Sequence, residues 1–279
     1  MSKIERSPLS WLQQDIEHRV GVTGGRFTRT NSALTFVLAL ALTAAFYACL
    51  VPFAGHYFAR MFTERGYVQY VTVLFSFWAL VILFVKVQKM RLQRRALGVR
   101  LVPDQPDFVL TGATAADVLS ELHRSCDDPR QFYLLNRIEL ALSNLRNMGR
   151  ISDVAEVLQT QASNDEDVME SSYSLVRGLI WAIPVLGFIG TVQGLSQAVG
   201  NFGAVLSDTA EVSALKPALR GVTAGLATAF ETTFVALVAA LGIQLLLTMI
   251  KRAEEQLLDD CKEYCQRQVV ARLRLTPFE

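Results

Sequence analysis

Residues 178–199 read GLIWAIPVLGFIGTVQGLSQAV, a run without a charged side chain. A helix needs roughly 20 apolar residues to cross the hydrocarbon core of a bilayer. Three further stretches meet this requirement: Ala33–Ala54, Tyr67–Val85 and Gly221–Ile250. The first of these also lacks charge, and the last contains a single charged residue, Glu231. The sequence therefore predicts an all-α polytopic membrane protein with four transmembrane helices and helical extensions on the cytoplasmic side.

The composition narrows the class of protein further. The 279 residues include 27 basic and 26 acidic side chains, for a net charge of +1, which argues against an electrostatic nucleic-acid binder. Hydrophobic residues make up 51% of the chain, so disorder is excluded for most of its length. Four cysteines and three scattered histidines do not make a disulfide framework or a metal site. We therefore expect no metal and no cofactor.

Basic residues next to the spans orient the chain in the membrane. They are dense in the N-terminal segment, after the second span and after the fourth: Lys3, Arg6, Arg19, Arg26, Arg29, Lys86, Lys89, Arg91, Arg94, Arg95, Arg100, Lys251 and Arg252. The loops at 55–66 and 200–220 hold few basic residues, and acidic residues offset them. Both termini are therefore predicted to be cytoplasmic.

This topology divides the chain into five segments. They are a cytoplasmic N-terminal segment with a short interfacial helix (1–32), a first transmembrane hairpin with a short periplasmic loop (33–88), a helical cytoplasmic region (89–177), a second transmembrane hairpin (178–250) and a cytoplasmic C-terminal helix (251–279).

The polar segments have their own helical patterns. Residues 9–20 predict the interfacial helix, with Trp11 near the membrane surface. Thr114 is a candidate cap for a helix through Ala115–Ser125. An apolar stripe then recurs at spacings of three and four, which indicates an amphipathic helix: Phe132, Leu135, Ile138, Leu142 and Leu145.

The second hairpin combines glycines, a proline and hydroxyl groups. Pro184 removes a backbone donor and favours a kink. Gly187, Gly190 and Gly194 leave a groove in which another backbone can approach closely. Helix packing alone would explain these glycines, so they do not by themselves indicate a functional site.

The last span is unusually polar in its outer half: Thr223, Thr228, Glu231, Thr232 and Thr233. An acidic residue near mid-membrane costs about 2.5–3.5 kcal/mol on insertion scales, so it usually faces protein or water. Glu231 is either a protonated carboxyl group hydrogen-bonded between helices or a functional group. Thr232 and Thr233 either bond to carbonyls one turn back or line a polar route.

Depth arithmetic places two of the hydroxyls at a similar height. Thr191 follows Arg177 by 14 residues, and Thr233 precedes Lys251 by 18 residues. At a rise of ~1.5 Å per residue, the two threonines lie roughly 21 and 27 Å from the cytoplasmic edge, within about one helical turn of each other. A ring of such hairpins would line a path through part of the membrane with hydrogen-bonding groups.

At these residues the sequence resembles a known family. Gly187-Phe-Ile-Gly190-Thr191-Val-Gln-Gly194, together with the segment from Gly225 through Thr233 to Ala240, looks like the paired helix motifs of the MotA/TolQ/ExbB proton-channel family. The motifs lie within 176–250. Four spans with a cytoplasmic segment between the second and third resemble the MotA arrangement, whereas the hairpin motif is closer to TolQ and ExbB.

The resemblance implies a function and an assembly. In such units a homopentamer surrounds a dimer of a single-span MotB/TolR/ExbD-like partner, whose aspartate carries the ion, and ion flow drives rotation. Thr191 and Thr233 match the family's threonines on the ion path, so hairpin 178–250 would line the pore. Thr228 stands where ExbB-like proteins can carry a glutamate, and Glu231 lies one turn further on. Pro184, the three glycines of the third span and Gly225 would serve helix packing. The implied location is the bacterial inner membrane.

The leading hypothesis is thus a stator-like ion-channel subunit that uses the proton or sodium motive force. No GxxxxGK[ST] nucleotide motif is present, so ATP is not the expected energy source. A structural membrane scaffold without ion conduction is the alternative. An intramembrane enzyme that uses Glu231 is a weaker one, because the sequence shows no paired carboxylate, HExxH or Ser/Lys dyad. The choice of proton or sodium stays open.

Overall fold

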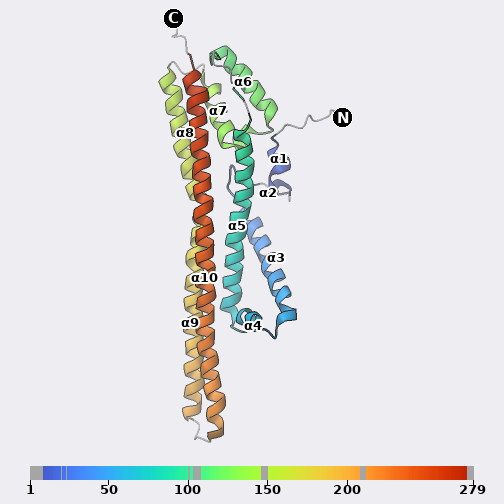
Figure 1. The fold of residues 1–279 in the computed structure, drawn as a ribbon, viewed down its shortest axis with the longest axis vertical. Helices are drawn as coiled ribbons and strands as arrows, with labels where there is room; N and C mark the ends of the chain where they lie inside the picture. Colours follow the sequence, from blue (N-terminus) through green and yellow to red (C-terminus); the bar gives the residue numbers. More distant parts are fainter. Residues whose placement is uncertain are drawn as a thin grey trace. The chain divides into compact units, whose positions relative to one another are not determined.

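The computed structural model describes residues 9–19, 21–22, 24–99, 101–102, 108–145, 150–207 and 212–274, and within these ranges the chain is helical and has no β-strand (Figure 1). The principal helices are α1 (Trp11–Gln14), α2 (Ile16–Arg19), α3 (Ser32–Leu50), α4 (Tyr57–Thr63), α5 (Tyr67–Leu97), α6 (Gly112–Ser125), α7 (Tyr133–Ser143), α8 (Ile151–Ser172), α9 (Ser174–Ser207) and α10 (Val212–Tyr264). A π-helical turn, Cys265–Val269, follows α10. Some residues used above to predict the membrane orientation lie outside the described residues: Lys3, Arg6, Arg100 and the loop residues 208–211.

Four helices of the described chain are long and apolar enough to cross a membrane. They are the stretches Ser32–Phe53, Tyr67–Leu97, Ile151–Gly200 and Leu219–Arg272. Each contains one of the four predicted spans or most of it, so the prediction of an all-α membrane protein with four candidate spans is confirmed. Helices α5, α9 and α10 extend beyond the apolar runs that the sequence marked.

The chain divides into two compact units, and α5 and α10 contribute to both. Unit 1 consists of Met1–Leu34, Phe84–Ser174 and Met249–Glu279, and unit 2 of Thr35–Leu83 and Leu175–Thr248. Unit 2 therefore holds most of each predicted span, and unit 1 holds most of the polar segments.

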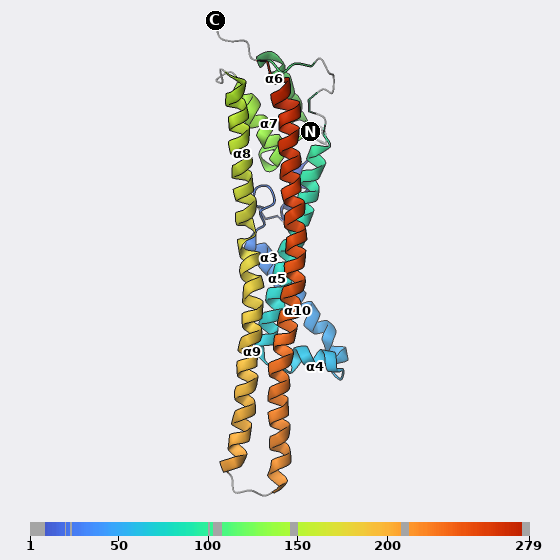
Figure 2. The same cartoon turned by 60° about the vertical axis from the view of Figure 1, so that its left-hand side comes forward.

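In unit 2, α9 and α10 run side by side as a long antiparallel hairpin in both views (Figures 1 and 2). Helix α3 packs on α5, where the indole Nε1 of Trp78 donates to the Thr35 hydroxyl at 3.2 Å and its ring meets Phe36 edge-on. Large apolar side chains on the hairpin stay exposed, such as Trp181 and Phe188 on α9 and Phe230 and Phe234 on α10. Such continuous apolar faces are typical of helices that contact lipid or other membrane helices.

In unit 1, α6, α7 and α8 pack with the C-terminal part of α10 and the N-terminal segment. The stripe predicted for this region is the core of the unit: Phe132, Leu135, Ile138, Leu142 and Leu145 are all buried. The amphipathic interpretation of residues 132–145 is therefore confirmed.

Two local predictions in unit 1 were wrong in detail. Helix α6 is capped one turn earlier than predicted, because the Thr111 hydroxyl accepts from the Thr114 backbone N–H and the Thr114 hydroxyl accepts from that of Thr111. Thr114 thus occupies the third helical position of a capping box. Within the predicted helix 9–20, of which Val20 lies outside the described residues, the chain forms two four-residue helices, interrupted at Asp15. The Trp11 ring, expected at the membrane surface, is buried edge-on against Phe132.

Candidate functional site

Four oxygen atoms, two from α9 and two from α10, lie together at the interface between these helices. The Thr191 hydroxyl lies within 3.2 Å of both the Gly187 and the Ala229 carbonyl oxygens. The Thr233 hydroxyl lies 2.9 and 3.1 Å from the same two oxygens and contacts the Thr191 hydroxyl directly. Each threonine follows one of these carbonyls by four residues on its own helix, so the arrangement is nearly two-fold symmetric. We call Thr191, Thr233 and these two carbonyls the four-oxygen cluster.

The prediction that the Thr191 and Thr233 hydroxyls lie at a similar height is confirmed, because the two hydroxyls contact each other. What the cluster offers chemically is a set of exchangeable donors and acceptors. Two hydroxyl protons are shared among four oxygens, so each hydroxyl has more than one acceptor within reach. Such a group can relay a proton or coordinate a partly dehydrated cation. It contains no ionisable side chain of its own.

Glycines bring the two backbones close enough for this contact. An added Cβ at Gly187 would lie 2.7 Å from the Ala236 Cβ, and one at Gly194 would lie 2.6 Å from both the Ala229 nitrogen and the Gly225 oxygen. These separations are shorter than carbon contacts allow, so only glycine fits.

Two more of the predicted packing residues, Gly190 and Gly225, also lie at this interface. A Cβ at Gly190 would meet the Thr232 Cβ at 2.8 Å, and one at Gly225 would meet the Gly194 oxygen at 2.7 Å. Pro184 lies inside α9, which continues past it.

Of the other two candidate threonines, Thr232 touches the cluster only through a shared acceptor, and Thr228 lies outside it. Thr232 is fully buried against Gly190, and its hydroxyl lies 2.9 Å from the Thr228 carbonyl and 3.2 Å from the Ala229 carbonyl, which belongs to the cluster. The Thr228 hydroxyl bonds to the Ala224 carbonyl, also one turn back. Both therefore satisfy their hydroxyls locally.

Glu231 is held by an arginine that the sequence analysis did not assign to it. Arg65 Nε donates to one carboxylate oxygen at 2.8 Å and Arg65 Nη2 to the other at 3.1 Å, and the Tyr57 hydroxyl donates at 2.8 Å. The carboxylate is therefore ion-paired within its own chain. An intramembrane acid calls for a partner, and this requirement is the signal in the sequence from which Arg65 could have been found. In the sequence we weighed that residue only as a charge that orients the chain.

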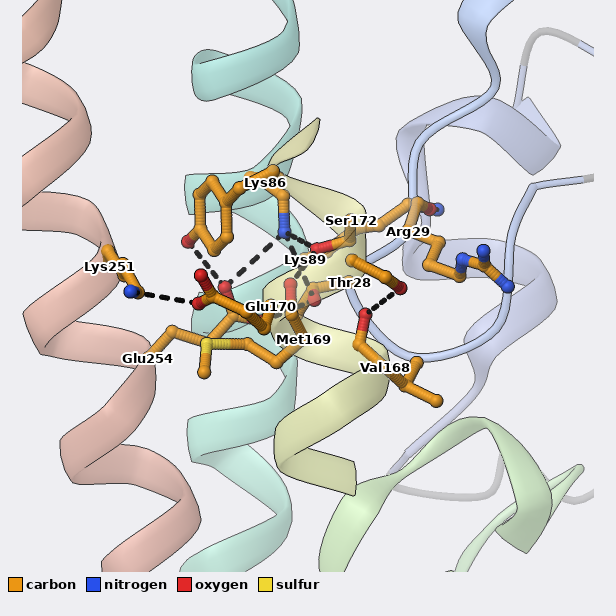
Figure 3. A network of polar contacts seen from close by, with 12 residues as sticks. Thr28, Arg29, Lys86, Lys89, Val168, Met169, Glu170, Ser172, Lys251 and Glu254 are labelled. Carbon is orange, nitrogen blue, oxygen red and sulfur yellow. Dashed lines mark hydrogen bonds and ion pairs between the residues drawn. The ribbon is translucent and has the colours of Figure 1, made fainter. Parts of the chain in front are cut away.

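A second set of charges is buried in unit 1 (Figure 3). Lys86 and Glu254 are each 1% exposed and form an ion pair at 3.4 Å. Glu254 accepts from four donors: Thr28, Lys86, Tyr133 and Tyr173. Nearby, Lys89 donates to the Glu17 carboxylate at 2.5 Å and to the carbonyls of Arg29 and Gly25 at 2.7 and 3.3 Å. The sequence analysis used both lysines only to orient the chain.

An apolar cavity of about 320 Å³ is also present in unit 2, among α3, α4, α5 and α10. Its lining is rich in phenylalanine, and its two hydroxyls, on Thr72 and Ser76, bond to carbonyls of their own helix. The cavity therefore offers packing surface and no reactive group.

Comparison with known proteins agrees with the hairpin motifs. Residues 132–263, just under half of the chain, match the MotA/TolQ/ExbB proton channel family. The match includes α9, the four-oxygen cluster, the packing glycines and Glu231. No curated protein and no solved structure matches the chain. The glycine contacts and the paired threonines of the hairpin thus lie within the segment, residues 132–263, that matches the MotA/TolQ/ExbB proton channel family.

Proposed function

We propose that this chain is a stator-like ion-channel subunit that uses a proton or sodium motive force to deliver mechanical work. The observation that carries the proposal is the four-oxygen cluster, in which Thr191 and Thr233 share two backbone carbonyls between the two helices of the hairpin. Each charge that crosses ~100 mV releases about 2.3 kcal/mol, which is enough to bias a conformational step.

The charges of the hairpin support a division of labour between two chains. The predicted spans contain one carboxylate, Glu231, and it is already paired with Arg65. The cluster itself has hydroxyls and carbonyls but no group that ionises near neutral pH. The group that loads and unloads the ion therefore comes from a partner. The partner we propose is a dimer of a single-span MotB/TolR/ExbD-like protein with an intramembrane aspartate.

The assembly that follows is a homopentamer around two partner helices in a bacterial inner membrane, with both termini in the cytoplasm. In such a ring the exposed apolar faces of α9 and α10 would contact lipid, neighbouring copies and the partner helices.

Native mass spectrometry in detergent tests this assembly. The chain is measured alone and after co-expression with a neighbouring single-span gene product that carries an intramembrane aspartate. We expect five copies that gain two copies of the partner. A monomer or dimer that binds no candidate partner would contradict the proposal.

A structural scaffold is the second candidate, because the glycine contacts by themselves account for a tightly packed hairpin. The two functions differ in ion flux. A scaffold gives none, whereas the channel subunit conducts in liposomes when the partner is present and stops when the partner's aspartate is replaced by asparagine.

A further inference from the structure

Arg65 and Glu231 form a two-pronged ion pair within unit 2. Both carboxylate oxygens are engaged, one by Arg65 Nε and the other by Arg65 Nη2 and the Tyr57 hydroxyl. The two side chains are 16% and 13% exposed. Paired, planar contacts of this kind are among the stronger charge-assisted hydrogen bonds, and shielding from water strengthens them further. We call Arg65, Tyr57 and Glu231 the charge clamp.

Of the clamp residues, Tyr57 begins α4, Glu231 lies on α10, and Arg65 lies in the turn between α4 and α5, which contacts both helices of the hairpin. Gly66, with a positive φ of 84°, reverses the chain directly after Arg65. A Cβ added at Gly66 would lie 3.9 Å from the Gln193 amide nitrogen on α9. The turn thus meets α9 at Gln193 and α10 at Glu231.

Both contact points, Gln193 and Glu231, are displaced along the helix axes from the four-oxygen cluster. Gln193 follows Thr191 by two residues on α9, and Glu231 precedes Thr233 by two on α10. Because the helices are antiparallel, both steps lead about 3 Å toward the end of the hairpin where α9 stops and α10 starts. An ion that enters from that end comes to the level of the clamp before it reaches the threonines.

Around the helix axis, Glu231 points away from the cluster. Two residues correspond to a rotation of roughly 200°, so the Glu231 and Thr233 side chains leave α10 on nearly opposite sides. The contacts agree, since Thr233 faces α9 and Glu231 faces the α4–α5 turn. Without Arg65, Glu231 would keep a single donor, Tyr57, and an uncompensated negative charge.

We propose that Arg65 is a specificity-determining residue that neutralises Glu231 and so keeps it from acting as a second cation-binding site, on the side of α10 away from the threonine pair. Ion flow then depends on the partner's carboxylate alone. This inference rests on the proposed function and adds to it the reason why an intramembrane acid of the chain does not conduct by itself.

The test is proton and sodium flux in liposomes that contain the assembled chain, with and without its partner. For Arg65→Met without partner we expect flux roughly tenfold or more above wild type, because an unpaired carboxylate at membrane depth attracts protons and cations. Arg65→Met/Glu231→Gln should return to the wild-type baseline. Arg65→Lys keeps the positive charge but loses the two-pronged guanidinium contact, so its partner-independent flux should be lower than that of Arg65→Met.

Arg60→Met is the matched control. Arg60 also belongs to the α4 region, and among the described residues its ion pair is with Glu64, with both side chains more than half exposed. It should leave the flux unchanged with and without partner. If Arg65→Met fails to assemble, Glu231→Gln replaces it and should keep partner-dependent flux at the wild-type level.

Each outcome decides between the two claims. Wild-type protein that does not conduct with its partner removes the proposed function. Wild-type protein that conducts normally while Arg65→Met shows no partner-independent flux removes this inference alone. Loss of partner-dependent flux in Glu231→Gln also overturns it, since Glu231 would then belong to the path.

Discussion

The buried charges of unit 1 and the hairpin of unit 2 solve the problem of buried polar groups in different ways. In unit 1, Lys86 and Glu254 are nearly inaccessible, and each has several hydrogen-bonding partners. At the four-oxygen cluster, polarity is limited to hydroxyls and carbonyls that share their protons, and glycines hold the helices together. Helix α10 contributes to both, with Glu254 in one and Thr233 in the other.

If the protein works as proposed, the difference indicates which region changes as ions pass. Removing one partner of a buried ion pair strands the other charge, so such a network resists rearrangement. Hydroxyl–carbonyl contacts are weak individually, at about 1 kcal/mol each, and have alternative acceptors within reach. We infer that unit 1 is the rigid anchor and that the hairpin is the part that responds to the ion.

The largest expected effect comes from stranding a buried charge. Glu254→Gln or Lys86→Met alone should destabilise the protein by about 3–5 kcal/mol, because the remaining charge loses its counter-charge in a dry site. The double variant should recover a large part of that loss. Thermal unfolding in detergent measures all three. Single variants as stable as wild type would remove the rigid-anchor interpretation.

The next effect concerns close approach in the hairpin. Gly194→Ala places a methyl group 2.6 Å from the Ala229 nitrogen and should cost about 1–3 kcal/mol through overpacking. Gly200→Ala on the same helix meets no atom within 4 Å and gains the same helix propensity, about 1 kcal/mol. The difference between the two melting temperatures isolates the contact. If both variants gain stability equally, the close approach is not formed.

Two buried glutamines on α5 sharpen the comparison. Gln93, in unit 1, donates to the Gln131 carbonyl at 2.7 Å and accepts from the Tyr133 backbone N–H at 3.0 Å. Gln69, in unit 2, is fully buried, and neither of its side-chain polar atoms has a hydrogen-bond partner. Gln93→Leu should cost about 2 kcal/mol, since it orphans two backbone groups. Gln69→Leu should be neutral or stabilising. The reverse order of melting temperatures would contradict this difference in hydrogen bonding between Gln93 and Gln69.

The smallest effect is a pH dependence in unit 1. Burial opposes the charge of Asp127, but hydrogen bonds from the Leu12 and Trp11 backbone N–H groups and the Ser10 hydroxyl more than offset it and lower the pKa of Asp127 from its usual 3.8. A lowered native pKa adds stability that is complete above pH 3.8 and disappears as the pH falls through the native value. Asp127→Asn should therefore lose about 1 kcal/mol at neutral pH, with the gap to wild type closing on acidification. A gap that stays constant with pH would refute this.

The features of the fold that depend on local sequence patterns were predictable. Apolar runs with at most one charged residue marked the four spans, spacings of three and four marked the buried stripe from Phe132 to Leu145, and a constant rise per residue put Thr191 level with Thr233. Pairings between distant segments were not predictable in this way. Arg65 meets Glu231 across 166 residues and Lys86 meets Glu254 across 168, and no periodicity encodes such a pairing. Short-range competition misled as well, because both Thr111 and Thr114 suit a helix cap.

The central claim is that the paired hydroxyls of Thr191 and Thr233 conduct the ion that the partner carries. Partner-dependent flux in liposomes tests it most directly, with Thr191→Val and Thr233→Val compared with Thr223→Val. In the described part of the chain, the Thr223 hydroxyl bonds to the Arg220 carbonyl of its own helix. Native mass spectrometry on the same samples reports whether the assembly is intact. We predict that both paired-threonine variants assemble normally and lose most of the flux, while Thr223→Val conducts like wild type. Full flux in both Thr191→Val and Thr233→Val, in intact assemblies, would contradict the account.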